Sequence, residues 1–257
     1  MKKKSLGLNG LRILNTRPAG QNQTLSQEIM TAGGIPVALP ALVIEPTEET
    51  WLQQLPDLTR IQQCVFISAN AVKFFFTTLK KHGVAWPHSI KTIAIGPATA
   101  HALADWSIQV DTIPEVADSE HLLKLAELQH IEGQTLVLIK GIGGKMTIAN
   151  TLLERGANSM ALSVYRRVLP TCDAQEIGAL WKHNLVDIIL FTSQQAMQNI
   201  FALFGQEAHS WLCNKPCIVI SERLAEIART IGMKTILVSR YENLLNTLEL
   251  YIKNAPR

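Results

Sequence analysis

Short apolar runs rich in valine and isoleucine recur along this chain, and each is followed by an amphipathic stretch with helical periodicity. Continuous apolar strands that alternate with helices are typical of βαβ units, whose parallel sheets are covered on both faces. The right-handed crossover of such units places the carboxyl ends of the strands along one edge. The sequence therefore predicts an α/β fold. The predicted strand and helix pairs are 12–16 with 19–32, 64–68 with 70–82, 92–96 with 97–105, 135–140 with 145–155, 187–193 with 194–204, and 217–221 with 222–231.

The same sequence features return after about 125 residues, which is close to half of the 257-residue chain. A simpler interpretation is open, because any two βαβ domains share features at this level. We interpret the ordered matches as a duplicated unit, which predicts two similar, doubly wound parallel-sheet domains. The matched pairs are Phe66 (FISANAV) with Phe191 (FTSQQAM), Ile93 (IAIGPATA) with Ile218 (IVISERLA), Gly33 with Gly156, and His121 with Asn243.

Hydroxyl, amide, glycine and cationic residues follow the predicted strands at the points where helices begin. Ligands of open α/β sheets bind beyond the carboxyl ends of the strands, where helix N-termini favour anions. Plain N-capping of the helices is the alternative for each single residue. Taken together, these positions predict a crevice between the two domains that binds a polyanion. The residues are Thr16, Arg17, Ser68, Asn70, Gly96, Thr99, Lys140, Gly141, Thr192, Ser193 and Ser221.

The motifs of several well-known classes of catalytic and nucleotide-binding site are absent from the sequence. The segment 140–146 (KGIGGKM) follows a strand, but it matches neither the P-loop spacing nor G-x-G-x-x-G, so it indicates an unspecified carboxylate or phosphate contact. G-x-S-x-G and H-E-x-x-H motifs are absent, and the seven histidines are scattered. Cys64 and Cys217 lie in apolar runs, Cys213 and Cys217 lack the C-x-x-C spacing, and we expect no metal site.

The charge distribution and the hydropathy pattern limit the partners and the compartment. The formal net charge is +3, and it is not concentrated beyond lysines 2–4, so we expect no nucleic-acid partner. No apolar run approaches the roughly 18 residues of a membrane span. The basic start is followed by polar residues rather than by the apolar segment of a signal peptide. Together with cysteines that are expected to stay reduced, this predicts a cytoplasmic protein without a membrane partner.

An ordered set of motifs resembles the uroporphyrinogen-III synthase family, over residues from about 11 to 250. In this family two domains are joined by a pair of extended linkers, which the proline-bounded segments 35–46 and 159–170 match. The resemblance implies one domain built from 1–40 plus 168–257, a second from 44–164, and linkers at 41–43 and 165–167. The motifs begin at Asn15 (NTRP), Phe66 (FISANAV), Ala94 (AIGPATA), Asp118 (DSEHLL), Arg155 (RGA), Val164 (VYR) and Phe191 (FTS).

The resemblance also implies an activity. The family closes the linear tetrapyrrole hydroxymethylbilane to uroporphyrinogen III, with loss of water and inversion of the last pyrrole ring through a spiro intermediate, without cofactor or metal. By position, Tyr165 matches a tyrosine that assists departure of the hydroxyl, although the residues alone leave a packing role equally open. Thr192 and Ser193 match a strand end whose amides meet substrate carboxylates, and the matched motif adds Ser119. Where many relatives keep a threonine this chain has SERLA from Ser221, so Ser221 or Arg223 is expected to substitute.

Two other classes of protein compete with the enzyme. A non-enzymatic, two-lobed cytoplasmic protein that binds a small polyanion would share the duplicated lobes. A nucleotide-binding regulatory module is disfavoured by the failed phosphate motifs. The resemblance implies a lyase whose partner is a polycarboxylate tetrapyrrole substrate, and we expect a monomer.

Overall fold

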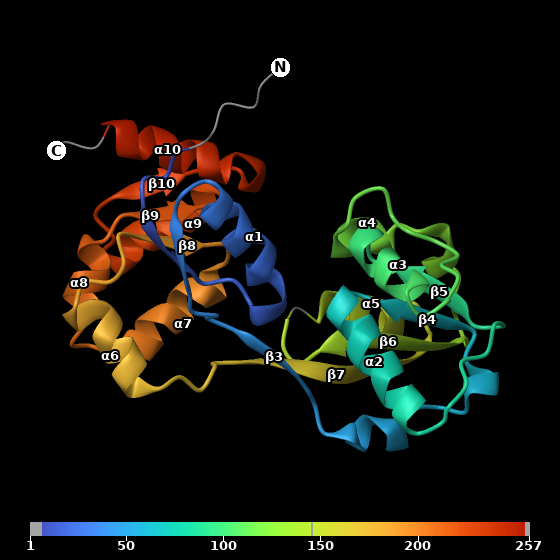
Figure 1. Cartoon of the computed structure of the whole chain (residues 1–257). Coiled ribbons are helices and arrows are strands. Elements are labelled where there is room, and N and C mark those ends of the chain that lie inside the picture. The colour runs from blue at the N-terminus through green and yellow to red at the C-terminus, as the bar shows by residue number, and fades with distance from the viewer. Residues whose placement is uncertain (1–6, 145, 255–257) are drawn as a thin grey trace. The chain divides into compact units, whose positions relative to one another are not determined.

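The computed structural model describes residues 7–144 and 146–254, without the side chains of residues 20 and 21. Lysines 2–4 and Lys145, which the sequence analysis noted, lie outside these residues. The chain divides into two compact units (Figure 1). Unit 1 comprises Met1–Val43 and Val168–Arg257, and unit 2 comprises Ile44–Arg167. Residues 165–167, which we expected to form a linker, belong to a long strand that pairs within the sheet of unit 2.

The sheet of unit 1 is parallel throughout, and apolar side chains fill both of its faces. Across the sheet the strands run in the order β10 (Ile236–Val238), β9 (Cys217–Val219), β8 (Ile188–Phe191), β1 (Arg12–Asn15) and β2 (Ile35–Ala38). Alternate residues of β8 enter opposite cores: Ile188 and Leu190 enter one, and Ile189 and Phe191 the other. This alternation is the period of two of a strand, and it explains why a continuous apolar run marks a strand with two covered faces.

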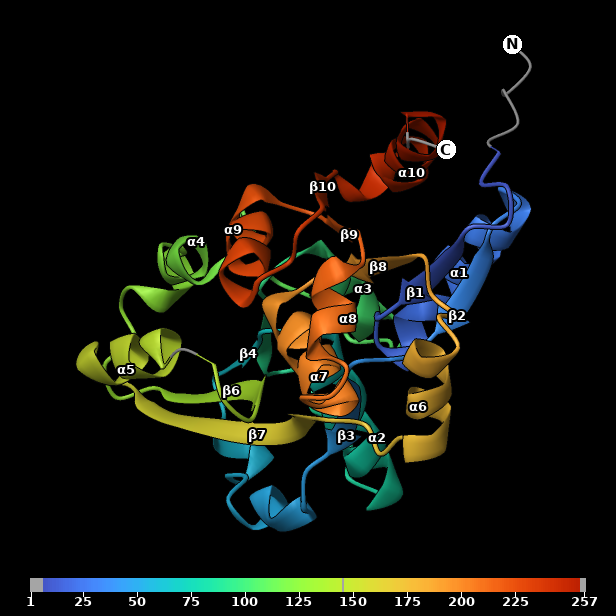
Figure 2. The same cartoon turned by 90° about the vertical axis from the view of Figure 1, so that its left-hand side faces the viewer.

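The helices of unit 1 divide between these two faces. Side chains of α1 (Ala19–Thr31) and α10 (Leu244–Asn254) pack in the core that holds Ile188. The core that holds Ile189 is covered by four helices, of which α7 and α8 lie next to each other in orange (Figure 2). They are α6 (Ala174–Lys182), α7 (Gln194–Phe204), α8 (His209–Asn214) and α9 (Glu222–Ile231).

Unit 2 has a sheet of the same design. Its strands run in the order β3 (Val43–Pro46), β7 (Asn158–Val168), β6 (Thr135–Gly141), β4 (Gln63–Phe66) and β5 (Lys91–Ala94). The pairs β7–β6, β6–β4 and β4–β5 are parallel. Here too, alternate residues of the central strand enter different cores, with Cys64 and Phe66 on one face and Val65 on the other.

The aromatic side chains of unit 2 gather on the Phe66 face. Helices α2 (Ala69–Lys81) and α3 (Pro97–Ala104) cover this face, where the rings of Phe66 and Phe75 meet edge to face with centroids 5.7 Å apart. Helices α4 (Ser119–Leu123) and α5 (Thr147–Glu154) supply apolar side chains to the core of the other face. The predicted α/β fold with doubly covered parallel sheets is therefore confirmed.

The duplication is visible in the topology. The consecutive strands β9-β8-β1-β2 of unit 1 correspond to β5-β4-β6-β7 of unit 2. Even the short strand β10 has a counterpart in unit 2. Leu237 of β10 pairs with Ile218, and at the equivalent place in unit 2 Thr112 makes an isolated parallel bridge to Ile93. Gly33 and Gly156 follow equivalent helices with φ of +80° and +79°, a conformation that glycine adopts at little cost.

Candidate functional site

In unit 2 the predicted residues gather at the carboxyl ends of three neighbouring strands. Ser68 follows β4, Gly96 follows β5, and Lys140 and Gly141 end β6. Because these strands are parallel and adjacent, their ends lie along one edge of the sheet. The remaining predicted residues of this unit, Asn70, Thr99 and Ser119, lie in the first turns of α2, α3 and α4.

Tyr165 lies buried beside this edge, with 3% of its surface exposed. In β7 it pairs with Gly141, and the ring covers the glycine so closely that a Cβ there would lie 2.5 Å from the ring Cζ. Phe74 stacks on the ring with centroids 6.0 Å apart. The structure thus joins Gly141 and Tyr165 in one packed contact, and an alanine at position 141 would collide with the phenol.

The phenol oxygen of Tyr165 accepts two hydrogen bonds. Ser68 Oγ donates over 3.1 Å and Arg167 Nη2 over 3.2 Å, and the Arg167 guanidinium also lies 5.4 Å from the ring centroid. Sequence reasoning singled out Tyr165 and Ser68 but missed Arg167. A signal was available, because Arg167 follows the Val-Tyr-Arg motif by one residue and, on a strand, shares the face of Tyr165.

Lys140 is a buried cationic residue at the same edge of unit 2. Only 6% of its surface is exposed, and its ammonium contacts Met146 Sδ at 3.5 Å. A thioether is a weak acceptor, so this contact compensates little for burying the charge. An anion would be a stronger partner for this ammonium than the thioether is.

Gly96 and Asp118, the residue before Ser119, have structural roles in unit 2. The Asp118 carboxylate caps α4 beside Ser119, accepting from the backbone N–H of His121 at 2.8 Å, and this hydrogen bond lowers the pKa of Asp118 below its ordinary value. A substrate carboxylate at that helix end would meet a like charge. At Gly96 a Cβ would lie 2.5 Å from the Cβ of Ala117, so the close approach of that loop requires glycine.

In unit 1 the predicted residues follow β1, β8 and β9. Thr16 is fully buried, and its hydroxyl donates to the Leu190 carbonyl over 2.6 Å, so it ties β1 to β8. Ser193 accepts from Ala196 N at 3.1 Å and caps α7, preceded by the half-buried Thr192. Ser221 accepts from Leu224 N at 3.3 Å and caps α9, while Arg223 is exposed.

Three serines therefore act as N-caps, as the alternative interpretation anticipated. Ser68 does so for α2, accepting from Ala71 N at 3.0 Å, and Ser193 and Ser221 do so for α7 and α9. Each cap occupies one of the four N–H groups that a helix start leaves without an intrahelical partner. N-capping and anion binding are thus compatible at these positions.

Arg17 contacts a residue that sequence reasoning missed. Its guanidinium donates a hydrogen bond to the Tyr241 hydroxyl and lies 4.7 Å from the centre of that ring. The repeat offered a signal, because the match of His121 with Asn243 makes Tyr241 the equivalent in unit 1 of the predicted site residue Ser119 in unit 2.

The duplication also relates the two cations. Ile13 pairs with Ile188 in unit 1, and Leu136 pairs with Gln63 in unit 2. Counting four residues on from Ile13 and from Leu136 gives Arg17 and Lys140. Arg17, just after β1, and Lys140, near the end of β6, therefore occupy equivalent positions in the two units.

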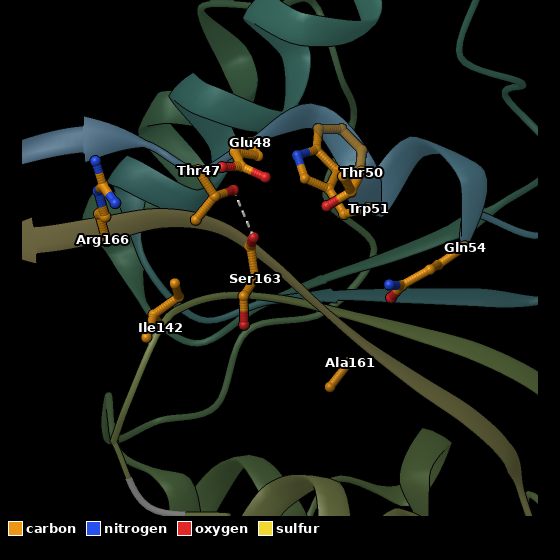
Figure 3. A pocket seen from close by; sticks show the side chains of 9 residues that line it. All are labelled: Thr47, Glu48, Thr50, Trp51, Gln54, Ile142, Ala161, Ser163 and Arg166. Atoms are coloured by element: carbon orange, nitrogen blue, oxygen red, sulfur yellow. Dashed lines mark hydrogen bonds between the residues drawn. The ribbon is translucent and has the colours of Figure 1, made fainter.

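A separate cavity in unit 2 contains none of the predicted residues. It has a volume of about 360 Å³ and lies between β7 and the 3₁₀ helix Glu49–Gln53 (Figure 3). Thr47 Oγ1 donates to the Ser163 carbonyl across it over 2.7 Å. Its lining residues are Thr47, Glu48, Thr50, Trp51, Gln54, Ile142, Ala161, Ser163 and Arg166.

Within 7–144 and 146–254, no three histidine, cysteine, aspartate or glutamate side chains come together in a group that could hold a metal ion. Across that same part of the chain, no helix has both the length and the apolar character needed to cross a membrane.

The structure is that of a duplicated α/β protein, in which the strand ends of each sheet carry serine-capped helix N-termini and a cationic residue. The family model described as "Uroporphyrinogen-III synthase HemD" matches residues 23–244. The chain belongs to the uroporphyrinogen-III synthase family. The resemblance found in the sequence motifs is therefore confirmed, and with it the expectation of an enzyme of tetrapyrrole biosynthesis.

Individual relatives agree with this assignment. The chain is 32% identical over 235 residues to the uroporphyrinogen-III synthase of Escherichia coli (strain K12), covering 89% of this chain and 95% of that protein. A mutant uroporphyrinogen III synthase of Thermus thermophilus superposes with a TM-score of 0.61 at 18% identity, covering 95% of this chain and 98% of that one. The uroporphyrinogen-III synthetase of Helicobacter pylori 26695 gives the same TM-score and identity, covering 96% and 100%. At this identity the two structures support the fold.

Proposed function

We propose that this chain converts hydroxymethylbilane to uroporphyrinogen III, releasing water and inverting the terminal pyrrole ring through a spiro intermediate. The observation that carries the proposal is the Tyr165 phenol, which is buried against Gly141 and hydrogen-bonded at the polar edge of unit 2. The family membership supports the same reaction. In the alternative, a non-enzymatic polyanion-binding protein, this phenol would serve packing alone.

The substrate is a polycarboxylate, since each pyrrole ring carries an acetate and a propionate. Carboxylates are stabilised by the free N–H groups and the dipoles at helix N-termini. The helices α2, α3, α7 and α9 begin at the strand ends where the predicted residues lie. We assign substrate binding to these helix N-termini together with Arg17 and Lys140. In unit 1, the N-terminus of α7 carries Thr192 and Ser193, and that of α9 carries Ser221.

Catalysis in this proposal depends on holding one conformer. Ring closure proceeds without an enzyme to the unrotated isomer I, so the enzyme has to keep the chain folded while the last ring turns. Tyr165 assists departure of the terminal hydroxyl as water. Strong acids and bases are not needed elsewhere, which is consistent with the absence of acidic side chains from the predicted set.

Further parts of the proposal concern organisation and setting. We assign the two units as the two domains, with the chain crossing between them at Val43–Ile44 and at Arg167–Val168. We also propose a monomer that acts in the cytoplasm without a cofactor. The four cysteines are free, as a reducing compartment favours.

The test is an isomer assay with hydroxymethylbilane generated enzymatically in place, followed by oxidation and chromatographic separation of isomers I and III. The wild-type chain should give mainly isomer III, and a product dominated by isomer I would refute the synthase. Tyr165→Phe should slow formation of isomer III by about 10²-fold or more, the usual contribution of a positioned acid.

Tyr251→Phe is the matched control, because Tyr251 packs against the core of unit 1 that holds Ile188, away from the strand ends. It should leave the rate unchanged. If Tyr165→Phe turned over as fast as the wild type, Tyr165 would be a packing residue.

A further inference from the structure

We propose that Arg167 is a positioning residue, which acts with Ser68 to direct the Tyr165 O–H toward the departing hydroxyl of the substrate. The inference rests on the proposed function and adds a residue to it. Its basis is the hydrogen bonding at the phenol oxygen, where both neighbouring side chains act as donors.

Arg167 determines the direction of the phenol proton by its chemistry. A guanidinium has five N–H donors and no acceptor, so the Tyr165 O–H cannot point at Arg167. Arg167 Nη2 lies 3.2 Å from the phenol oxygen, which therefore accepts this hydrogen bond. Because the donor is charged, the bond is stronger than one between neutral groups.

Ser68 occupies the second acceptor position of the phenol oxygen. Its Oγ accepts from Ala71 N at 3.0 Å as the cap of α2, which holds the hydroxyl in place. In the structure its own proton is donated to Tyr165 over 3.1 Å, and the second lone pair of Ser68 Oγ is left unused by this hydrogen bond. With both acceptor positions filled by donors, the Tyr165 O–H is left to donate to a group outside this cluster.

Packing prevents the ring from escaping this arrangement. One side of the Tyr165 ring rests on Gly141 and Phe74 stacks on it at 6.0 Å, while only 3% of the residue is exposed. Arg167 in contrast is exposed, so its guanidinium meets the phenol from the solvent side. Packing therefore holds the ring in place, and the Arg167 guanidinium orients the phenol from the solvent-exposed side.

The proton step balances with these residues. The Tyr165 O–H proton moves to the terminal hydroxyl, the C–O bond breaks with its electron pair going to oxygen, and water leaves. The phenolate that remains lies beside the Arg167 charge, which stabilises it. The pyrrole carbon that closes the ring later releases a proton, and this proton restores the phenol.

Arg166 provides a matched control on the same strand. Neighbouring residues of a strand point to opposite faces, and Arg166 instead pairs with Glu45 at 3.3 Å and lines the cavity of Figure 3. Arg166→Ala removes the same side chain one position away without touching the phenol. Any effect of general charge or strand stability would appear in both variants.

The experiment measures kcat and KM for isomer III in the wild type and in Arg167→Ala, Arg167→Lys and Arg166→Ala, with near-ultraviolet circular dichroism to verify folding. Arg167→Ala should lower kcat about 10–100-fold, the equivalent of one charged hydrogen bond, with KM within about twofold. Millimolar guanidinium should restore part of this kcat, and Arg167→Lys should fall between the two. Arg166→Ala should match the wild type and show no response to guanidinium.

Three results would overturn the inference: an unchanged kcat in Arg167→Ala, a loss confined to KM, or a loss that guanidinium does not relieve. If Arg167→Ala fails to fold, the decision passes to Arg167→Lys, whose kcat must fall while its circular dichroism stays native. Failure of the proposed function is distinct, because then the wild type itself yields no excess of isomer III.

Discussion

Gly141→Ala tests the contact between strand β6 and the Tyr165 phenol. The new methyl group would lie 2.5, 2.7 and 2.9 Å from three ring atoms, whereas carbon atoms in contact prefer about 3.5–4.0 Å. The ring has to move by about 1 Å, and Phe74 stacks against it. Gly141 has little freedom to retreat, because it pairs with Tyr165 itself in β7 and follows residues of β6 that pair with β4 as far as Ile139.

The expected magnitudes follow from this geometry. Overpacking of a core costs about 1–3 kcal/mol, and removing a glycine from a strand returns about 0.5–1 kcal/mol, so the net loss should be about 1–2 kcal/mol. The effect on catalysis should be larger. Displacing a reacting group by about 1 Å can cost about 10²-fold in rate, and the Tyr165 oxygen would also leave its two donors.

Urea unfolding followed by tryptophan fluorescence measures the stability, with separate transitions allowed for the two units, and the isomer assay measures the rate. Gly178→Ala in α6 is the control, since no atom lies within 4 Å of its Cβ position and a helical alanine should add about 0.5–1 kcal/mol. In a Tyr165→Ala background, Gly141→Ala should cost no stability. A single Gly141→Ala variant with the stability and rate of the wild type would refute the argument.

Two further predictions concern ionisation. Burial acts to raise the pKa of Asp187, but hydrogen bonds from Arg12, including Nη2 to Oδ1 at 2.5 Å, outweigh it and leave this pKa below its ordinary value. The pair therefore adds stability above the unfolded pKa of about 3.9 and loses it as the pH falls through the lower folded pKa. In thermal unfolding, Asp187→Asn should cost about 1 kcal/mol at pH 7 and little near pH 2. A difference in stability between variant and wild type that persists in acid would contradict this. Burial raises the pKa of Cys217 to about 12 and that of Cys64 well above its usual value. At pH 8, N-ethylmaleimide should therefore label the half-buried Cys172 well before either of them, as measured by peptide mass spectrometry. Equal labelling of these three thiols in the native protein would contradict the prediction.

The fold could be predicted because its signals are local. A run such as 187–193 reports a strand with two buried faces wherever it lies in the chain, and β8 was found there as Ile188–Phe191. The repeat transferred this information between the units, since the match of Phe66 with Phe191 also aligned the caps Ser68 and Ser193. The edge strand β10 was missed, because its three residues are only half-buried or exposed, whereas the equally short β9 is fully buried and lies in a clear apolar run.

The candidate site could be predicted only in part because its decisive contacts are not local. That Gly141 lies under the Tyr165 ring depends on the register of β6 against β7, which shifts between Lys140 and Gly141. The role of Arg167 depends on the same register. Residue type and spacing placed these residues at the carboxyl ends of the strands, where the structure has them, but they could not show which side chain meets which.

The mixed origin of unit 1 affects the order in which the protein can fold during synthesis. Strand β1 is paired on one side with β2, which ends at Ala38, and on the other with β8, which ends at Phe191. At about 5–20 residues per second, the ribosome needs roughly 10–30 s to pass from one to the other. During that time unit 2 is completed, while β1 exposes an unpaired edge of the kind that favours aggregation. The nascent chain therefore depends on the rapid folding of its inserted unit to bring the two ends of unit 1 together.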